Sequence, residues 1–267
     1  MTQLDTNSTK GKWWKRGDVR KVAIIWAILT PLIGYFGSTV QLNAMPDAAS
    51  TSMENIRHLM LVFTWAAAPV AALVFAFVVH SLTSKRHYGD NPPAEADHQI
   101  SNSPKANSIW LVTSSVLCLF ALVAGFVALQ KDDKALLDNN ATVINVVGQQ
   151  WVWNYDYPSS NGVRTQELHL VIHHPYVFHV TSKDVKHSFW IVQMGVKIDA
   201  NPGVFTETAV TPSRLGTFDI RCAELCGLLH AYMQNKVIVQ SQADYNVWLA
   251  QQGDTVLGAT VPGGSKA

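Results

Sequence analysis

The chain has 267 residues, a formal net charge of +1 and a hydrophobic share of 48%. This length allows one large domain or two smaller ones, and the near-neutral charge, with no dense basic run among aromatics, argues against a nucleic-acid partner. The apolar residues are concentrated in three blocks of the first half, a distribution typical of membrane-spanning helices.

The N-terminal region combines a basic segment with an apolar block. Residues 1–21 are polar and basic, and we expect them on the cytoplasmic side. Residues 22–40 form a first apolar span that is just long enough to cross a bilayer. A basic start before an apolar run also describes a secretory signal, but no Ala-x-Ala cleavage site follows and the run exceeds the usual signal length. We therefore favour a retained helix and leave cleavage open.

Two further apolar blocks predict a transmembrane hairpin over residues 59–130. Its spans are 59–79 and 109–129, and the connecting loop 84–105 carries Lys85, Arg86 and Lys105. Short basic loops remain in the cytoplasm, so this loop and the N-terminus are predicted inside and everything after residue 131 outside. The prediction is a multi-pass protein of the cell (plasma) membrane with an extracytoplasmic C-terminal domain. Cys118, within the third span, is interpreted as an ordinary buried thiol.

Residues 131–252 are predicted to form the outer domain, after a linker over 131–140. Alternating, β-branched segments predict strands near 142–147, 167–172, 177–182, 204–210, 216–221 and 236–240. Short strands with closely spaced turns favour an all-β sandwich. A terminal helix is expected over 243–251, with Tyr245, Trp248 and Leu249 on one stripe, and residues 253–267 are expected to be a disordered tail. The fold class is therefore mixed: transmembrane helices followed by a β-sandwich.

The segment 221–233 holds the residues most typical of a metal site. Cys222 and Cys226 lie four apart, followed by His230 and Met233, and His187 comes just after a predicted strand. Thiolate, imidazole and thioether ligands favour copper. A single blue-type copper needs one cysteine, whereas two thiolates from one loop can bridge two copper ions. A Cys222–Cys226 disulfide and a tetrahedral zinc site remain alternatives.

Three motifs resemble subunit II of haem–copper cytochrome oxidases. They are the loop Cys222–Met233, the segment Thr181–Phe189 and the aromatic run Gly148–Tyr157, and the likeness extends from about Leu59 to about Leu249. The resemblance implies a Greek-key cupredoxin-like domain with a binuclear copper centre, CuA. It also implies that this centre receives electrons from a cytochrome c or a similar donor. The electrons then pass to haem in subunit I, where O2 is reduced to water, so the enzymatic activity belongs to the complex.

The resemblance also assigns roles to the ligand residues. Cys222 and Cys226 would bridge both coppers, His187 and His230 would each cap one, and Met233 would be a weak ligand of one copper. The backbone carbonyl of Glu224 would be a weak ligand of the other. Its carboxylate would reach a magnesium or manganese ion shared with subunit I.

Electron acceptance is assigned to Trp151, also by resemblance. Trp153, Tyr155 and Tyr157 alternate with it along one strand face and are interpreted as packing residues. Acidic residues that could steer a basic donor are few, and a membrane-bound cytochrome or a cupredoxin is an equally good donor. The residues considered for donor docking are Asp156, Asp184 and Asp199.

The chain departs from the family pattern at two positions. Asn107 stands where a glutamate usually marks a proton path, although Glu95 or Asp97 could take that place, and Gln149 replaces a histidine. His169, His173 and His179 share strand parity, and we expect them on an exposed face without metal.

Three other functions were considered. A copper-free quinol oxidase subunit II would not need the cysteines. A membrane-anchored copper-delivery factor would carry a thioredoxin-like domain instead of an all-β one. A soluble CuA reductase domain would lack the membrane hairpin.

Overall fold

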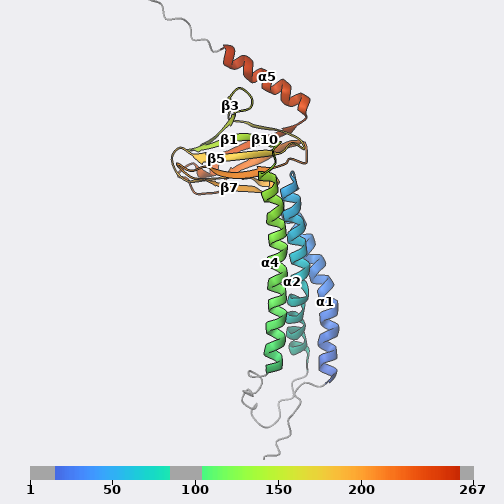
Figure 1. Cartoon of the computed structure of the whole chain (residues 1–267). Coiled ribbons are helices and arrows are strands. Elements are labelled where there is room, and N and C mark those ends of the chain that lie inside the picture. The colour runs from blue at the N-terminus through green and yellow to red at the C-terminus, as the bar shows by residue number, and fades with distance from the viewer. Residues whose placement is uncertain (1–15, 85–103, 259–267) are drawn as a thin grey trace, which may run out of the picture. The chain divides into compact units, whose positions relative to one another are not determined.

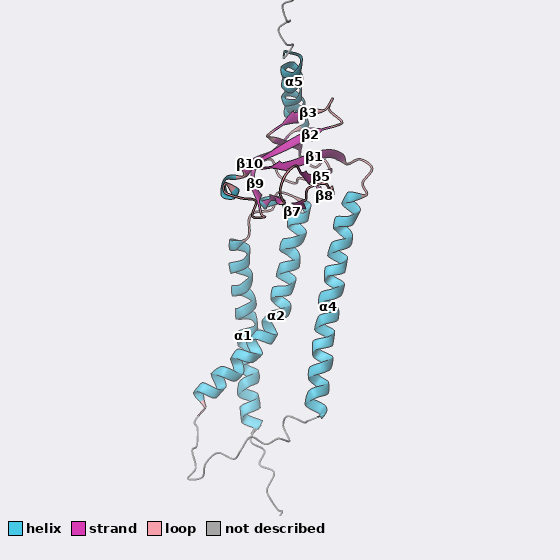
Figure 2. Cartoon of the chain, turned by 90° about the vertical axis from the view of Figure 1, so that its left-hand side faces the viewer, coloured by secondary structure: helices cyan, strands magenta, loops and turns pink. Residues whose placement is uncertain are grey.

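The computed structural model describes residues 16–84 and 104–258. Helices α1 (Arg16–Ala44), α2 (Thr51–Thr83) and α4 (Pro104–Leu136) come first (Figure 1). Every strand in the described part of the chain lies after α4, as the magenta segments of Figure 2 show. The prediction of transmembrane helices followed by a β-sandwich is confirmed.

All three helices are long and apolar enough to span a membrane, over 17–44, 51–83 and 104–130. Each is longer than the apolar core predicted from sequence, because the helix continues into polar residues at its ends. α4 reaches Leu136, so the first six residues of the predicted linker 131–140 are helical. Cys118 is exposed on α4. The expectation of a buried thiol was wrong, because nothing in the described chain covers the apolar surface of this span.

Helices α1 and α2 contact each other closely. The indole Nε1 of Trp26 donates a hydrogen bond to the carbonyl of Pro69 at 2.8 Å. A Cβ built on Gly34 would come within 2.6 Å of the Trp65 ring, so only glycine allows this approach. Asn107 is exposed in the first turn of α4, whereas Glu95 and Asp97 fall outside the described residues.

The outer domain consists of two five-stranded sheets. The first has the order β3-β2-β1-β5-β8 and the second β4-β10-β9-β6-β7, with 3-10 turns η1 (Val192–Met194) and η2 (His230–Tyr232). Strands β1 and β5 pair in parallel, as do β4 and β10, and the other pairs are antiparallel. The strand bounds are β1 Thr142–Gln149, β2 Val152–Tyr157, β3 Val163–Thr165, β4 Leu168–Val171, β5 Tyr176–Ser182, β6 His187–Ile191, β7 Val196–Ala200, β8 Thr206–Val210, β9 Gly216–Cys222 and β10 Gln234–Gln240.

The core between the sheets is rich in aromatic residues. Trp153, Tyr155 and Tyr157 are all buried on one face of β2 and belong to the same core cluster as Phe178 of β5 and Phe189 of β6. Trp153 and Phe189 make an edge contact with ring centroids 5.2 Å apart. The predicted packing role of the alternating aromatics is confirmed.

Residues 45–59 belong to the same compact unit as the sandwich, although the sequence placed the domain start at residue 131. The Ser50 hydroxyl donates to the Met194 carbonyl at 2.6 Å, and the Ala49 N–H donates to the Gln193 carbonyl at 2.8 Å. These contacts join residues 144 positions apart, so no local sequence pattern could predict that 45–59 pack with the sandwich.

Helix α5 (Gln242–Gly258) packs on β4 through the predicted stripe, with Tyr245 buried and Trp248 half-buried. The Trp248 ring lies at 5.5 Å from that of Tyr157. The first six residues of the predicted disordered tail, 253–258, are therefore helical. A glycine inside a helix costs only about 1 kcal/mol, which is too little to end one that is already anchored. Residues 259–267 lie outside the described part.

Candidate metal centre

The ligand loop is a closed connection between β9 and β10. Cys222 is the last residue of β9, and its N–H donates to the Met233 carbonyl at 3.0 Å, just before β10 begins. The Ala223 N–H donates to the Ser188 carbonyl of β6 at 2.9 Å. Both ends of the loop are therefore attached to the second sheet.

His187 reaches this loop because it is the first residue of β6, which pairs with β9. The register places Phe189 opposite Cys222, so the His187 side chain lies beside the cysteine. Gly148 of β1 makes room for the ring: a Cβ there would come within 3.1 Å of the His187 Cδ2. Trp153 contacts the same ring edge-on, with centroids 5.9 Å apart.

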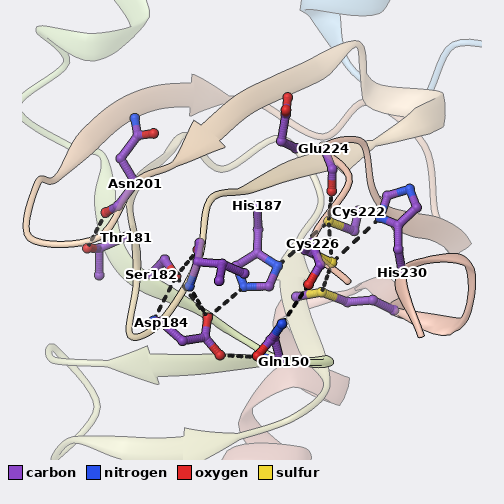
Figure 3. Close-up of polar contacts among 12 residues, drawn as sticks. Gln150, Thr181, Ser182, Asp184, His187, Asn201, Cys222, Glu224, Cys226 and His230 are labelled. Atoms are coloured by element: carbon purple, nitrogen blue, oxygen red, sulfur yellow. Dashed lines mark hydrogen bonds and ion pairs between the residues drawn. The ribbon is translucent and has the colours of Figure 1, made fainter. Parts of the chain in front are cut away.

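All the predicted ligand groups converge on the two cysteine sulfurs (Figure 3). The Cys222 and Cys226 sulfurs are 3.8 Å apart and form no disulfide. The Nδ1 of His187 lies 3.8 Å from Cys222 Sγ, and the Nδ1 of His230 lies 3.6 Å from Cys226 Sγ. Met233 Sδ is 3.8 Å from Cys226 Sγ, and the Glu224 carbonyl oxygen accepts from Cys222 Sγ at 3.3 Å.

Both cysteines are buried, His187 and Met233 are completely inaccessible to solvent, and His230 is half-buried. Burial and the neighbouring Cys222 sulfur raise the pKa of the Cys226 thiol to about 12. Without a positive partner this thiol keeps its proton. A metal ion would have to displace it, which is how thiolate ligands couple metal binding to proton release.

Asp184 orients His187. The Nε2–H of His187 donates to Asp184 Oδ1 at 2.9 Å, because an ionised carboxylate can only accept, and this bond turns the opposite nitrogen, Nδ1, towards Cys222. Partial burial works to raise the pKa of Asp184, but hydrogen bonds from Gln150, His187 and Val185 outweigh it and lower that pKa to about 2. From the sequence, Asp184 was considered for donor docking, and its contact with His187 was not predicted. The signal was present, because Asp184 stands only three residues before this predicted ligand.

Trp151 lies beside the ligand loop. It precedes β2 and is half-buried, and its ring is 3.4 Å from where a Cβ of Gly227 would stand. The described residues offer its buried indole Nε1 no hydrogen-bond partner.

The other predicted residues lie apart from the sulfurs. Asp199 pairs with Lys186 at 2.9 Å, and Asp156 lines a surface cavity of 470 Å³ together with Arg164 and Lys183. His169 is buried against Trp248, with ring centroids 4.0 Å apart. The expectation that it lies on an exposed face was wrong, because α5 covers β4.

The fold and the site define a membrane-anchored β-sandwich protein with a cluster of thiol, imidazole and thioether groups at one loop of the sandwich. Residues 164–242 match the family described as cytochrome C oxidase subunit II, periplasmic domain. This part of the chain is therefore similar to that family, and the predicted resemblance is confirmed. The matched segment contains all the predicted ligand residues but not Trp151.

Relatives with related names match longer stretches. The alternative cytochrome c oxidase subunit 2 of Bradyrhizobium diazoefficiens is 34% identical over 42% of this chain and 52% of its own length. Cytochrome c oxidase subunit 2 of Thermostichus vulcanus is 29% identical over 74% and 62% of the two chains. The chain thus spans about half to three-fifths of these relatives. Among solved structures, the periplasmic domain of subunit II of cytochrome oxidase from Bradyrhizobium japonicum is 28% identical, with a TM-score of 0.43 over 44% of this chain and 97% of that one.

Proposed function

We propose that this chain is the CuA-bearing subunit II of a respiratory haem–copper oxidase. The observation that carries the proposal is the convergence of His187, His230 and Met233 on two unpaired cysteine sulfurs 3.8 Å apart. Such soft ligands select copper over magnesium or calcium, and the thioether disfavours zinc.

The donor set fits two copper ions. Cys222 and Cys226 would be shared by both ions, and His187 and His230 would each hold one. Met233 would be a weak ligand of one copper and the Glu224 carbonyl a weak ligand of the other. A copper pair held by shared thiolates supplies reversible one-electron transfer with little change of geometry. The protein contributes a preorganised site, because these residues come from paired strands and from a loop that is closed at both ends.

Electrons would reach the site from a cytochrome c, or from a membrane-bound cytochrome or cupredoxin. Trp151 is the proposed receiving residue, because its ring packs on the loop at Gly227. The electrons would continue to haem in a partner subunit I, the site of O2 reduction. The Glu224 carboxylate would hold a magnesium or manganese ion at the contact with that subunit.

The test uses the full-length chain, purified from membranes in detergent and loaded with copper. We expect two copper ions per chain and a seven-line mixed-valence pattern in the paramagnetic resonance spectrum. Cys222→Ser and Cys226→Ser should each abolish that pattern, because each removes a bridge. Cys118→Ser, a thiol remote in sequence from the loop, is the control and should leave it unchanged.

Other outcomes identify the competing functions. One copper with four lines that passes readily to an acceptor protein would indicate copper delivery. Failure to bind copper would favour a quinol oxidase subunit. Persistence of the seven-line pattern in either loop variant would refute the bridging assignment.

A further inference from the structure

Gln150 lies in the turn between β1 and β2 and contacts two different parts of the metal centre (Figure 3). Its backbone N–H donates to Asp184 Oδ2 at 2.7 Å. Its side-chain Nε2–H donates to the Cys226 carbonyl at 2.7 Å. One residue thus joins segments that lie 34 positions and 76 positions away in the sequence.

These two bonds continue to the ligands themselves. Asp184 accepts from Gln150 through Oδ2 and from His187 through Oδ1. The result is a continuous chain of contacts, His187–Asp184–Gln150–Cys226. It links the histidine on β6 to the second cysteine through a path separate from the strand pairing of β6 with β9.

The loop needs such a link at Cys226. Strand pairing fixes Cys222, the last residue of β9, whereas Cys226 lies within the connection from β9 to β10 and belongs to no strand. Within the described part of the chain, Gln150 provides the one hydrogen bond from outside residues 222–233 to the stretch 224–230. The remaining bonds of that stretch stay within the loop, such as the His230 N–H to the Gly227 carbonyl at 3.1 Å.

Gly227 lets the Gln150 side chain approach. A Cβ at Gly227 would come within 2.9 Å of Gln150 Nε2, and the φ of +121° is one that other residues rarely adopt. The same glycine contacts the Trp151 ring. The amide, the indole and the loop therefore pack together as one unit.

We propose that Gln150 is a positioning residue of the metal centre: it sets the place of Cys226 relative to His187 and holds Trp151 against the loop. The proposal rests on the proposed function, since it assigns these ligands to copper. The group that a substitution can test is the side-chain N–H donor of Gln150. The backbone N–H that donates to Asp184 remains in every substitution except proline.

The decisive variant is Gln150→Met, which keeps the length and volume of the side chain but removes the donor. Gln149→Met is the matched control, because Gln149 is its exposed neighbour at the end of β1. In the copper-loaded, full-length chain, Gln150→Met should release copper to a chelator about tenfold faster, as is usual when a group that orients a metal ligand is lost. Its hyperfine pattern should also change, while Gln149→Met keeps the wild-type rate and spectrum.

A wild-type release rate and spectrum in Gln150→Met would overturn the proposal. If that variant fails to fold, Gln150→Asn, which is one methylene too short to reach Cys226, gives the same test. Alkylation of Cys226 in the metal-free chain provides a readout independent of copper, and it should be faster in Gln150→Met. A wild-type chain that binds no copper pair would refute the proposed function, and the alkylation rates would still decide the role of Gln150.

Discussion

At the scale of single residues, the site depends on glycines as much as on ligands. Gly148 and Gly227 stand where a Cβ would meet His187 and Gln150, respectively. Gly148 therefore allows His187 to approach the backbone of β1 closely, and Gly227 allows Gln150 to approach the backbone of the loop closely. Neither contact contributes much energy by itself, but both define where the sulfurs and the imidazoles can lie.

Gly227→Ala should displace the Gln150 amide and lower the stability of the domain by about 1–3 kcal/mol, the usual cost of a strained backbone conformation. The loop would lose copper retention as well. Thermal unfolding and the copper-to-protein ratio of the full-length chain measure the two effects.

Gly203→Ala is the control for backbone strain alone. Gly203 also has a positive φ, of +73°, but nothing lies within 4 Å of its Cβ position. This variant should lose some stability and keep its copper. Equal loss of copper in both variants would show that contact with Gln150 is unimportant.

Trp151→Phe should keep normal copper content and slow electron transfer from the donor by about tenfold, equivalent to about 1.4 kcal/mol in the barrier. Stopped-flow reduction by the purified donor measures this rate. Trp190→Phe is the control: this half-buried tryptophan also lies near the ligands, lining a 270 Å³ cavity with Cys222, His230 and Met233. A slowed rate in Trp190→Phe with a wild-type rate in Trp151→Phe would place the electron path on the other side of the loop.

The sequence predicted the groups that meet at the two sulfurs but not the residues that hold these groups in place. Cys222, Cys226, His230 and Met233 share one short segment, so their spacing was readable. Asp184 and Gln150 act through hydrogen bonds between segments that meet only in the folded sandwich. Such bonds produce no recognisable spacing pattern in the sequence.

At the scale of elements, α5 covers the outer face of β4 and so determines the burial of the whole strand. All four residues of β4 are buried, because one face meets the core and the other meets the helix. His169 is therefore enclosed between Trp248 and Glu167, whose carboxylate is 3.4 Å from its Nε2.

The stability of the domain should fall as the pH drops below the ordinary range of histidine, about 6.5. Burial lowers the pKa of His169, and the contact with Glu167 opposes this only in part. A lowered pKa in the folded state means that the unfolded chain binds the proton first, so acid favours unfolding. Stability is complete above the unfolded-state pKa and is lost as the pH falls towards the lower, folded-state pKa.

His169→Gln tests this effect through unfolding midpoints measured between pH 8 and pH 5. The variant should lose less stability over this range than the wild type. His173→Gln, at an exposed histidine in the turn after β4, is the control and should follow the wild type. Identical pH profiles for all three proteins would exclude His169 as the group responsible.

Most elements were predicted from alternation and apolar runs, and the strands that were missed are short or do not alternate. The helices, the terminal stripe and the strands with β-branched alternation were found. Strands β3, β6 and β7 were not among the predicted strands. β3 has only three residues, too few to show a period, and burial does not alternate along β6 and β7. The burial of His169 needed knowledge of where α5 packs, which strand parity could not provide.

At the scale of the whole molecule, the chain combines two compact units, one helical and one built around the sandwich. The sequence separated them at residue 131, whereas residues 45–59 belong with the sandwich. The start of α2 thus belongs to the unit of the sandwich, whereas the rest of this helix belongs to the helical unit.

The orientation in the membrane follows from the positive charges at one end of the helices. Lys and Arg are retained on the cytoplasmic side, so the sandwich should face outwards and the start of α4 inwards. In intact cells, a membrane-impermeant maleimide should label Ser159→Cys, an exposed position in the turn after β2, and should not label Ala106→Cys, an exposed position in the first turn of α4.

Both variants need the Cys118→Ser background, because Cys118 is exposed on α4 while Cys222 and Cys226 are buried. Permeabilised cells are the control, and there both positions should react. Labelling of Ala106→Cys but not Ser159→Cys in intact cells would reverse the topology. The metal centre would then face the cytoplasm, where a donor outside the membrane could not reach Trp151, so the proposed electron path requires the outward orientation.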